Sequence, residues 1–251
     1  MSRFDRAAGL ARSLAIYHGI PLRQRRLRRL YRHFVERGDL AFDIGAHAGN
    51  RVRALAALGC RVIAVEPQPD FAKLLRVLFA RRASVVVVQA AVGESAGRTP
   101  LSISERTPTV TTATDAWRAA RADEPDFAGV RWNGTIEVEM TTLDLLIARF
   151  GVPAFIKIDV EGSEPAVLSG LTHAIAGLSF EYLPRALDQV RTCVDRLATL
   201  GDYRFNRSSG ESYELAEENW MTGRELVEAF GSPGQLHGSG DIYAQLKERR
   251  I

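Results

Sequence analysis

The chain has 251 residues, of which 46% are hydrophobic and 25% are charged, and its formal net charge is +3. This composition is typical of a globular chain with one core, and the sequence shows no internal repeat or low-complexity tract. Two cysteines, Cys60 and Cys193, are too few for a disulfide framework, and no apolar run approaches the ~20 residues that span a bilayer. We therefore expect a protein of a reducing compartment, located in the cytoplasm, with no transmembrane segment.

The positive charge is concentrated near the N-terminus, in the stretch PLRQRRLRRLYRHFVERGDL. Apolar residues recur there at helical spacing, and arginines occupy the remaining positions. We predict an amphipathic helix that ends near Gly38, with N-terminal helices in residues 1–38 and the main domain in residues 39–251. The arginine face suits either a solvated surface on a packed helix or peripheral contact with an acidic membrane or another polyanion. Elsewhere arginines alternate with acidic residues, which does not favour nucleic-acid binding.

The next stretch, LAFDIGAHAGNRVRALAALGCRVIAVEPQPDFAKLL, has the pattern of a strand–helix–strand–helix unit. It predicts a glycine turn from Gly45 to Gly49, a helix through Leu58, and a second helix from about Pro69. Glycines let a backbone approach a ligand closely, and the first helix offers unpaired N–H groups at its N-terminus. Glu66 follows Asp43 by roughly the 20 residues at which a carboxylate binds the ribose hydroxyls of a nucleotide.

The glycine turn discriminates between nucleotides. A dinucleotide site uses G-x-G-x-x-G, whereas this chain has D-x-G-x-x-x-G, with Asp43 in place of the first glycine. A carboxylate there is unfavourable for a pyrophosphate and suits a cationic ligand end, such as the sulfonium and ammonium of S-adenosylmethionine. An NAD(P)-dependent oxidoreductase and a non-catalytic anion-binding module are the alternatives.

The remainder predicts an open, mostly parallel sheet. Third, fourth and fifth buried strands are expected at SVVVVQAAVG, AFIKIDVEG and GLSFEYL. Between the third and fourth strands lie two strand-like runs, PLSIS and TIEVEM, separated by a long polar segment that we interpret as a substrate lid or insertion at residues 105–133. The last third predicts a helix near residues 185–200, extended pieces at YRFN and SYEL, a helix at TGRELVEAF and a final strand at DIYAQL.

The fourth strand carries unexpected charges in FIKIDVEGSE. Side chains alternate along a strand, so Lys157, Asp159 and Glu161 project to one side, beside the turn that follows Asp43. Clustered carboxylates raise one another's pKa, so Asp159 or Glu161 is a candidate base, and Lys157 could hold the acidic pair or orient an acceptor. The alternative is a structural ion pair of Lys157 with Asp159 or Asp43, with Glu161 and Glu164 capping the next helix.

Two further residues are candidates. Glu181, at the end of the fifth strand, could complete an acidic ring with Asp159, and such a ring is one arrangement that holds Mg2+, although the sequence alone does not call for a metal. His47 lies in the glycine turn, where it is either a base or an ordinary turn residue.

Several segments, in their order and spacing, resemble the FkbM-type S-adenosylmethionine-dependent O-methyltransferases. They are FDIGAHAGN, AVEPQP, QAAVGESAGRTPLSIS, TTLDLL, FIKIDVEGSEPAVLSGL and LSFEYLP, within residues 40–184. The resemblance implies an α/β fold of the class I methyltransferase (Rossmann-like) type, with a mostly parallel seven-stranded sheet, helices on both faces and an antiparallel last strand. It also implies methyl transfer to a hydroxyl of a saccharide or secondary metabolite. DVEG is unlike the Asn/Asp-Pro-Pro motif of enzymes that methylate base nitrogens, so a nucleic-acid acceptor is not expected.

The site candidates fall into two groups. The cofactor-binding candidates are Asp43, Gly45, Ala46, Gly49, Glu66, Pro67, Gln89, Ala90 and Asp159. The catalytic candidates are Asp159, Lys157, Glu161, Glu181 and His47.

Overall fold

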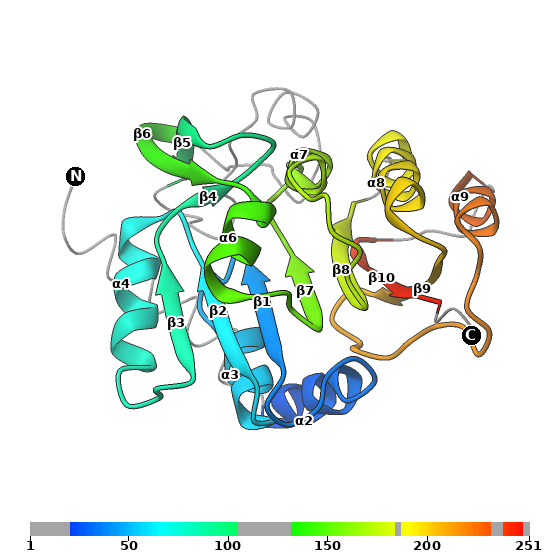
Figure 1. The fold of residues 1–251 in the computed structure, drawn as a ribbon, viewed down its shortest axis with the longest axis horizontal. Coiled ribbons are helices and arrows are strands. Elements are labelled where there is room, and N and C mark those ends of the chain that lie inside the picture. Colours follow the sequence, from blue (N-terminus) through cyan, green and yellow to red (C-terminus); the bar gives the residue numbers. More distant parts are fainter. Residues whose placement is uncertain (1–20, 105–131, 184–186, 232–237, 248–251) are drawn as a thin grey trace.

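The computed structural model describes residues 21–104, 132–183, 187–231 and 238–247. Within them a seven-stranded sheet has the order β3-β2-β1-β7-β8-β10-β9 (Figure 1). Its strands are β1 (Leu40–Ile44), β2 (Arg61–Val65), β3 (Val85–Val88), β7 (Phe155–Ile158), β8 (Gly177–Tyr182), β9 (Tyr203–Ser209) and β10 (Gly240–Leu246). Neighbouring strands in the run β3-β2-β1-β7-β8 pair in parallel, whereas β10 is antiparallel to both β8 and β9. This is the sheet of the class I methyltransferase fold, with the antiparallel strand that we expected.

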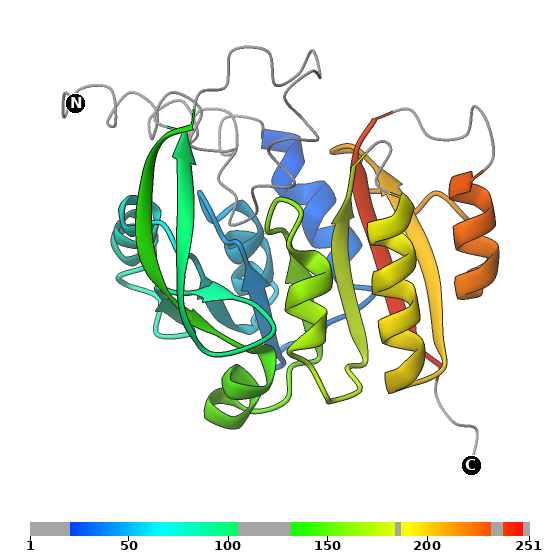
Figure 2. The same cartoon turned by 90° about the horizontal axis from the view of Figure 1, so that it is seen from above.

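Helices cover both faces of the sheet (Figure 2). One face carries α2 (Pro21–Tyr31), α3 (Asn50–Ala57) and α4 (Pro69–Leu78), and the other carries α6 (Leu143–Phe150), α7 (Glu164–Ser169), α8 (Leu187–Leu200) and α9 (Gly223–Gly231). Each layer encloses its own apolar core against the sheet. Because the central strands are covered on both sides, they are mostly buried and apolar, and Asp43 in β1 and Lys157 in β7 are buried charged exceptions.

A second, three-stranded sheet stands beside the carboxyl ends of the main strands. It consists of β4 (Ala91–Val92), β5 (Gly97–Ser104) and β6 (Trp132–Thr141), in the order β4-β6-β5. The expectation of one continuous third strand in SVVVVQAAVG is therefore wrong, because β3 pairs with β2 while β4 pairs with β6. The predicted lid falls largely on residues 105–131, outside the described residues, and residues 132–133 begin β6.

The basic helix α2 is shorter than predicted, since it ends at Tyr31 rather than near Gly38. Its apolar stripe is buried, with Leu27 1% exposed, and the Tyr31 ring lies 5.5 Å from that of Phe155 in β7. Arginines on its opposite side, Arg25 and Arg29 among them, are exposed. The helix is thus packed on the sheet with an exposed basic face, and contact of that face with an acidic membrane or another polyanion stays a prediction.

SYEL forms no strand in the structure, although YRFN lies within β9 as predicted. Among the described residues, no helix has both the length and the apolar character needed to cross a bilayer.

Candidate active site

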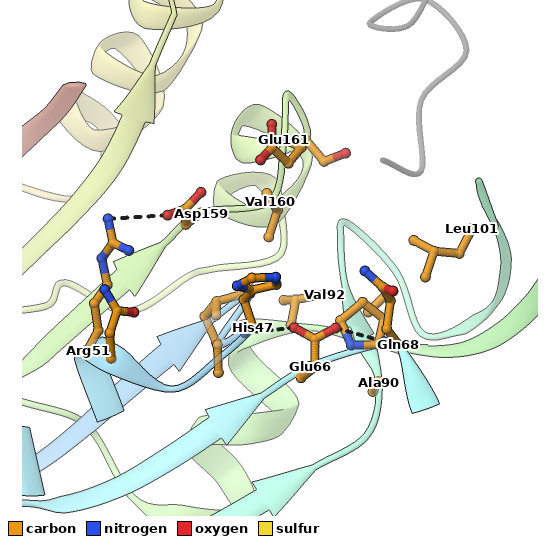
Figure 3. Close-up of a pocket in the computed structure, with 17 residues that line it drawn as sticks. His47, Arg51, Glu66, Gln68, Ala90, Val92, Leu101, Asp159, Val160 and Glu161 are labelled. Carbon is orange, nitrogen blue, oxygen red and sulfur yellow. Dashed lines mark hydrogen bonds and ion pairs between the residues drawn. The ribbon is translucent and has the colours of Figure 1, made fainter. Parts of the chain in front are cut away.

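A pocket opens at the carboxyl ends of β1, β2 and β7 (Figure 3). The turns that follow these strands supply most of its wall, and β4 and β5 add apolar side chains. Of the predicted residues, those that line the pocket are Gly45, Ala46, His47, Glu66, Pro67, Ala90, Asp159 and Glu161. Ligands of open α/β sheets bind beyond the carboxyl ends of the strands where the connections diverge, and here β1 lies between β2 and β7.

The remaining candidates do not line the pocket. They are Asp43, Gly49, Gln89, Lys157 and Glu181. Gln89 is exposed and accepts a hydrogen bond from Arg76 at 3.2 Å, so the geometry does not support direct binding of a ligand by its side chain. Asp43 is 1% exposed and lies within β1, beneath the turn. The expectation that Asp43 faces the ligand directly is likewise not supported.

The glycines of the turn are needed for contacts within the protein. Gly45 has φ of 81°, and a Cβ atom there would lie 1.8 Å from the carbonyl oxygen of Asp159. Gly49 has φ of 77°, and its Cβ would meet Leu75 and Phe79 of the α4 region at 2.7 and 2.8 Å. These glycines are therefore required for the close approach of the β7 turn and of the α4 side chains. That they also admit a ligand stays a prediction, and of the two only Gly45 lines the pocket.

Glu66 is fixed at the end of β2. Its Oε2 accepts a hydrogen bond from the N–H of His47, and its Oε1 accepts one from the N–H of Gln68, both at 2.8 Å. Glu66 is 4% exposed, and burial raises the pKa of its carboxyl to about 7, although these two N–H groups oppose the shift. The carboxyl therefore stands in the pocket wall with its orientation already set.

His47 lies in the middle of the turn with φ of 44°, in the left-handed region that non-glycine residues rarely adopt. Its ring packs on Phe71, with 4.0 Å between ring centroids. Burial lowers the pKa of the imidazole to about 4, so the ring is neutral near pH 7.

Beside the turn, two cations and two carboxylates alternate. Lys157 is fully buried, and its Nζ lies 2.7 Å from Asp241 Oδ1 and 3.6 Å from Asp159 Oδ2. Arg51 Nη2 lies 3.4 Å from Asp159 Oδ2 and 3.6 Å from Asp241 Oδ2. Each carboxylate thus faces both cations. The predicted ion pair between Lys157 and Asp159 exists, but the shorter contact of Lys157 is to Asp241, which the sequence analysis did not select.

These charges determine which carboxyl groups are ionised. Burial favours the neutral acid of Asp159, but Lys157 and Arg51 more than offset it, and the pKa of Asp159 is lowered. The expectation that clustering raises the pKa of Asp159 is therefore wrong. Asp43 differs, since burial outweighs Arg51 and Lys157 and raises its pKa to about 6.

Asp159 and Glu181, which we expected to share an acidic ring, lie together with Glu161, with one oxygen of each within 4.8 Å of the others. Burial and the charge of Asp159 raise the pKa of Glu181 well above its ordinary value. Glu161 has φ of 54° and Gly162 follows it at 93°, so Glu161 lines the pocket from a tight left-handed turn. A requirement for Mg2+ stays a prediction, because three carboxylates by themselves do not identify a metal site.

Glu164 has a structural role. It is 3% exposed, begins α7, and accepts a hydrogen bond from the N–H of Val160 at 3.1 Å. Burial raises the pKa of this carboxyl to about 7. Glu164 thus fits the structural alternative as an acid in the first turn of α7, although its side chain closes the turn before the helix and the N-cap residue is Ser163.

Sequence reasoning missed several residues of this region. The missed residues are Asn50, Arg51, Gln68, Leu101 and Ser163 in the pocket wall and Asp241 beneath it. Asp241 did carry a signal, since it is an acid in a mostly apolar final strand, and a charge in such a strand is the signal that selected Lys157. Arg51 carried none, because an arginine in a first helical turn is unremarkable until its carboxylate partners are known.

The strand order, the pocket at the strand ends and the carboxylates after β2 and β7 agree with a match to a protein-family model. The methyltransferase FkbM domain matches residues 43–205, well over half of the chain. The chain belongs to the FkbM methyltransferase family.

Solved structures similar to this FkbM chain include an O-methyltransferase from Bacillus cereus in complex with SAH, which is 13% identical with a TM-score of 0.46 and covers 96% of this chain and 91% of that chain. A precorrin-6y C5,15-methyltransferase from Geobacter metallireducens is 12% identical with a TM-score of 0.45, over 90% of this chain and 87% of that chain. A putative RNA methyltransferase from Pyrococcus horikoshii is 11% identical with a TM-score of 0.43, over 90% and 82%. Among curated proteins no sequence matches. The acceptor has to be inferred from the residues of the site itself.

Proposed function

We propose that the protein is an S-adenosylmethionine-dependent O-methyltransferase that acts on a hydroxyl of a saccharide or another small hydroxylated metabolite. The observation that carries the proposal is the placement of Glu66 and Asp159 after β2 and β7, in the wall of one pocket, in a chain of the FkbM family. Such a pocket suits a nucleoside at one carboxylate and the reacting atoms at the other.

The residues present fit this cofactor. The fixed carboxyl of Glu66 suits two ribose hydroxyls, and the apolar side chains of Ala90, Val92 and Leu101 suit the faces of an adenine. The bound cofactor would supply a methyl group already activated on a sulfonium. Asp159, held ionised by Lys157 and Arg51, places negative charge on the side of the pocket opposite those apolar residues in the view of Figure 3.

The acidic ring is suited to binding and deprotonating a hydroxyl. Asp159, which is ionised, can accept a hydrogen bond from the acceptor and hold its oxygen in line for transfer. Glu181 does not itself line the pocket, but one of its carboxylate oxygens lies within 4.8 Å of one of Asp159, and its higher pKa makes it the better proton acceptor of the two once it is ionised. Two carboxyl groups whose environments push their pKa values apart are typical of such a division of roles.

Cofactor titration tests this proposal. Isothermal titration should show binding of S-adenosylmethionine and S-adenosylhomocysteine but not of NAD or NADP. Hydroxylated metabolites, saccharides first, are then screened for formation of S-adenosylhomocysteine, and the rate of an accepted substrate should rise with pH as Glu181 loses its proton. Binding of NAD without binding of S-adenosylmethionine would favour the oxidoreductase alternative.

We also propose that the protein is located in the cytoplasm. This location is supported by Cys60 and Cys193, which are both free and buried.

A further inference from the structure

Three polar side chains in the pocket wall hold a buried atom that has no hydrogen-bond partner among the described residues. The atoms are Asn50 Nδ2, Arg51 Nε and Ser163 Oγ. Asn50 is 4% exposed and Ser163 is 9% exposed, so solvent reaches them poorly. A buried donor without a partner is costly, and native structures keep few of them. Three at one pocket indicate that a ligand supplies the acceptors.

Two of these donors lie where a helix favours an anion. Asn50 and Arg51 are the first two residues of α3, which has no acidic residue in its first turn and no side-chain cap from Gly49. The N–H groups and the helix dipole at such an end attract negative charge. The N-terminus of α3, the guanidinium of Arg51 and the amide of Asn50 therefore all favour binding of an anion.

Arg51 retains donors for a ligand. Its contacts with Asp159 and Asp241, at 3.4 and 3.6 Å, are ion pairs longer than ordinary hydrogen bonds, and both involve Nη2. A guanidinium has five N–H donors, and its planar geometry matches a carboxylate. In the view of Figure 3, Arg51 lies at the end of the pocket opposite Leu101, with Glu66 between them.

We propose that Asn50 and Arg51, assisted by Ser163, bind the carboxylate of the amino-acid end of the cofactor. This inference rests on the proposed function, because it assumes that Glu66 and the apolar wall receive the nucleoside. The ionised Asp159 next to Arg51 then faces the ammonium and sulfonium. The negative carboxylate of the ligand thus faces Arg51, and its positive groups face Asp159.

The experiment compares S-adenosylhomocysteine with its decarboxylated analogue, S-adenosyl-3-thiopropylamine, by isothermal titration. The wild-type protein should bind the analogue about 10- to 100-fold more weakly, which is the loss of one or two charge-assisted hydrogen bonds. Arg51→Ala should lower the affinity for S-adenosylhomocysteine by a similar factor and the affinity for the analogue by less than about 3-fold. Asn50→Ala should show the same selectivity with a loss of about 3- to 10-fold.

Arg53→Ala is the matched control, since Arg53 is exposed on the same helix and does not line the pocket. It should leave both ligands unaffected. Arg51→Ala also breaks ion pairs, so the melting temperature of each variant is measured without ligand. Asn50→Ala keeps the test decisive if Arg51→Ala fails to fold, because the amide nitrogen it removes has no partner in the described part of the chain.

The outcomes separate the two proposals. Equal affinity of the wild-type protein for the two ligands would overturn the carboxylate site and leave cofactor binding intact. Variants that bind S-adenosylhomocysteine normally but raise KM for an acceptor would also overturn it, by assigning the donors to the acceptor. Absence of binding of either ligand would overturn the proposed function itself.

Discussion

The Glu66 carboxyl has two roles, because it accepts hydrogen bonds from the N–H groups of His47 and Gln68 and, in our proposal, also binds the ribose. Glu66→Ala should weaken S-adenosylhomocysteine about 10- to 100-fold, since charge-assisted hydrogen bonds of ~1.5–3 kcal/mol are lost and water partly replaces them. Titration calorimetry measures the change. Gln89→Ala, which alters an exposed side chain outside the pocket lining, should leave the affinity unchanged. An unchanged Kd for Glu66→Ala would remove Glu66 from the site.

Asp159 and Asp241 share Lys157 and Arg51 but differ in exposure and distance, which separates catalytic from structural charge. Asp159→Asn leaves the 2.7 Å pair of Lys157 with Asp241, so we expect turnover to fall ~10²–10⁴-fold with little loss of stability. Asp241→Asn removes the closest partner of a fully buried ammonium and should cost about 3 kcal/mol of unfolding free energy.

Melting temperature and single-turnover methyl transfer are measured on both variants. If Asp159→Asn unfolds readily while its folded fraction turns over normally, the charges of this strand are structural and our assignment of Asp159 is wrong.

Glu164 predicts a pH dependence of stability. Its pKa is raised to about 7 from the ordinary value near 4.5, so the folded state binds more protons than the unfolded state between these values. This contribution is present in acid and is lost as pH rises through 7. Glu164→Gln, which can still accept the Val160 hydrogen bond, should therefore lose about 1 kcal/mol less than the wild type between pH 6 and 8.

Urea unfolding at the two pH values measures this difference. Glu94→Gln, at an exposed position, should show the same change in unfolding free energy between pH 6 and 8 as the wild type. If Glu164→Gln also shows the wild-type change, this carboxyl is ionised in the folded protein throughout the range.

At the scale of elements, the glycine turn allows a steric test. Gly45 and Gly38 have φ of 81° and 97°, but only the Cβ added at Gly45 meets an atom within 4 Å, the Asp159 carbonyl oxygen at 1.8 Å. Gly38→Ala should cost about 1 kcal/mol for its left-handed backbone. Gly45→Ala should cost several kcal/mol more, because the β7 turn has to move. Chemical denaturation of both variants gives the difference, and equal losses would mean that the turn yields without cost.

Elements with a clear period were predicted well from the sequence, and those set by distant pairing were not. The strand–helix unit from Leu40 to Leu75 gives β1, α3, β2 and α4, since each has a local apolar pattern with glycine or proline at its ends. SVVVVQAAVG has one apolar pattern yet contributes to two sheets, because β4 pairs with β6 across a long insertion. The ion pair of Lys157 with Asp241 joins residues 84 positions apart, and no local pattern reports such a partner.

At the scale of the whole molecule, the residues before β1 and the catalytic fold share a core. The predicted boundary at residue 38 separates α2 from the rest, but the apolar stripe of α2 belongs to the same buried cluster as Leu55 of α3 and Phe155 of β7. Arg25 and Arg29 face solvent on the opposite side. Contact of this basic face with an acidic membrane therefore stays a proposal that does not require the helix to leave the sheet.

Docking of α2 predicts a large difference between two leucines of the same helix. Leu27 is 1% exposed in the shared core, whereas Leu22 is 61% exposed. Leu27→Ala should lower the unfolding free energy by about 2–5 kcal/mol through lost burial and the cavity left behind, and Leu22→Ala by less than about 0.5 kcal/mol. The stability of both variants is measured by urea denaturation monitored by circular dichroism. Their affinity for S-adenosylhomocysteine is measured separately. Gln24 of α2 also donates a hydrogen bond to the carbonyl of Asn50 at the start of α3, at 3.0 Å. Leu27→Ala should therefore lower the affinity for the cofactor as well as the stability of the fold. If instead both variants are as stable as the wild type, α2 detaches from the sheet in solution, and a chain that begins at residue 39 would fold on its own.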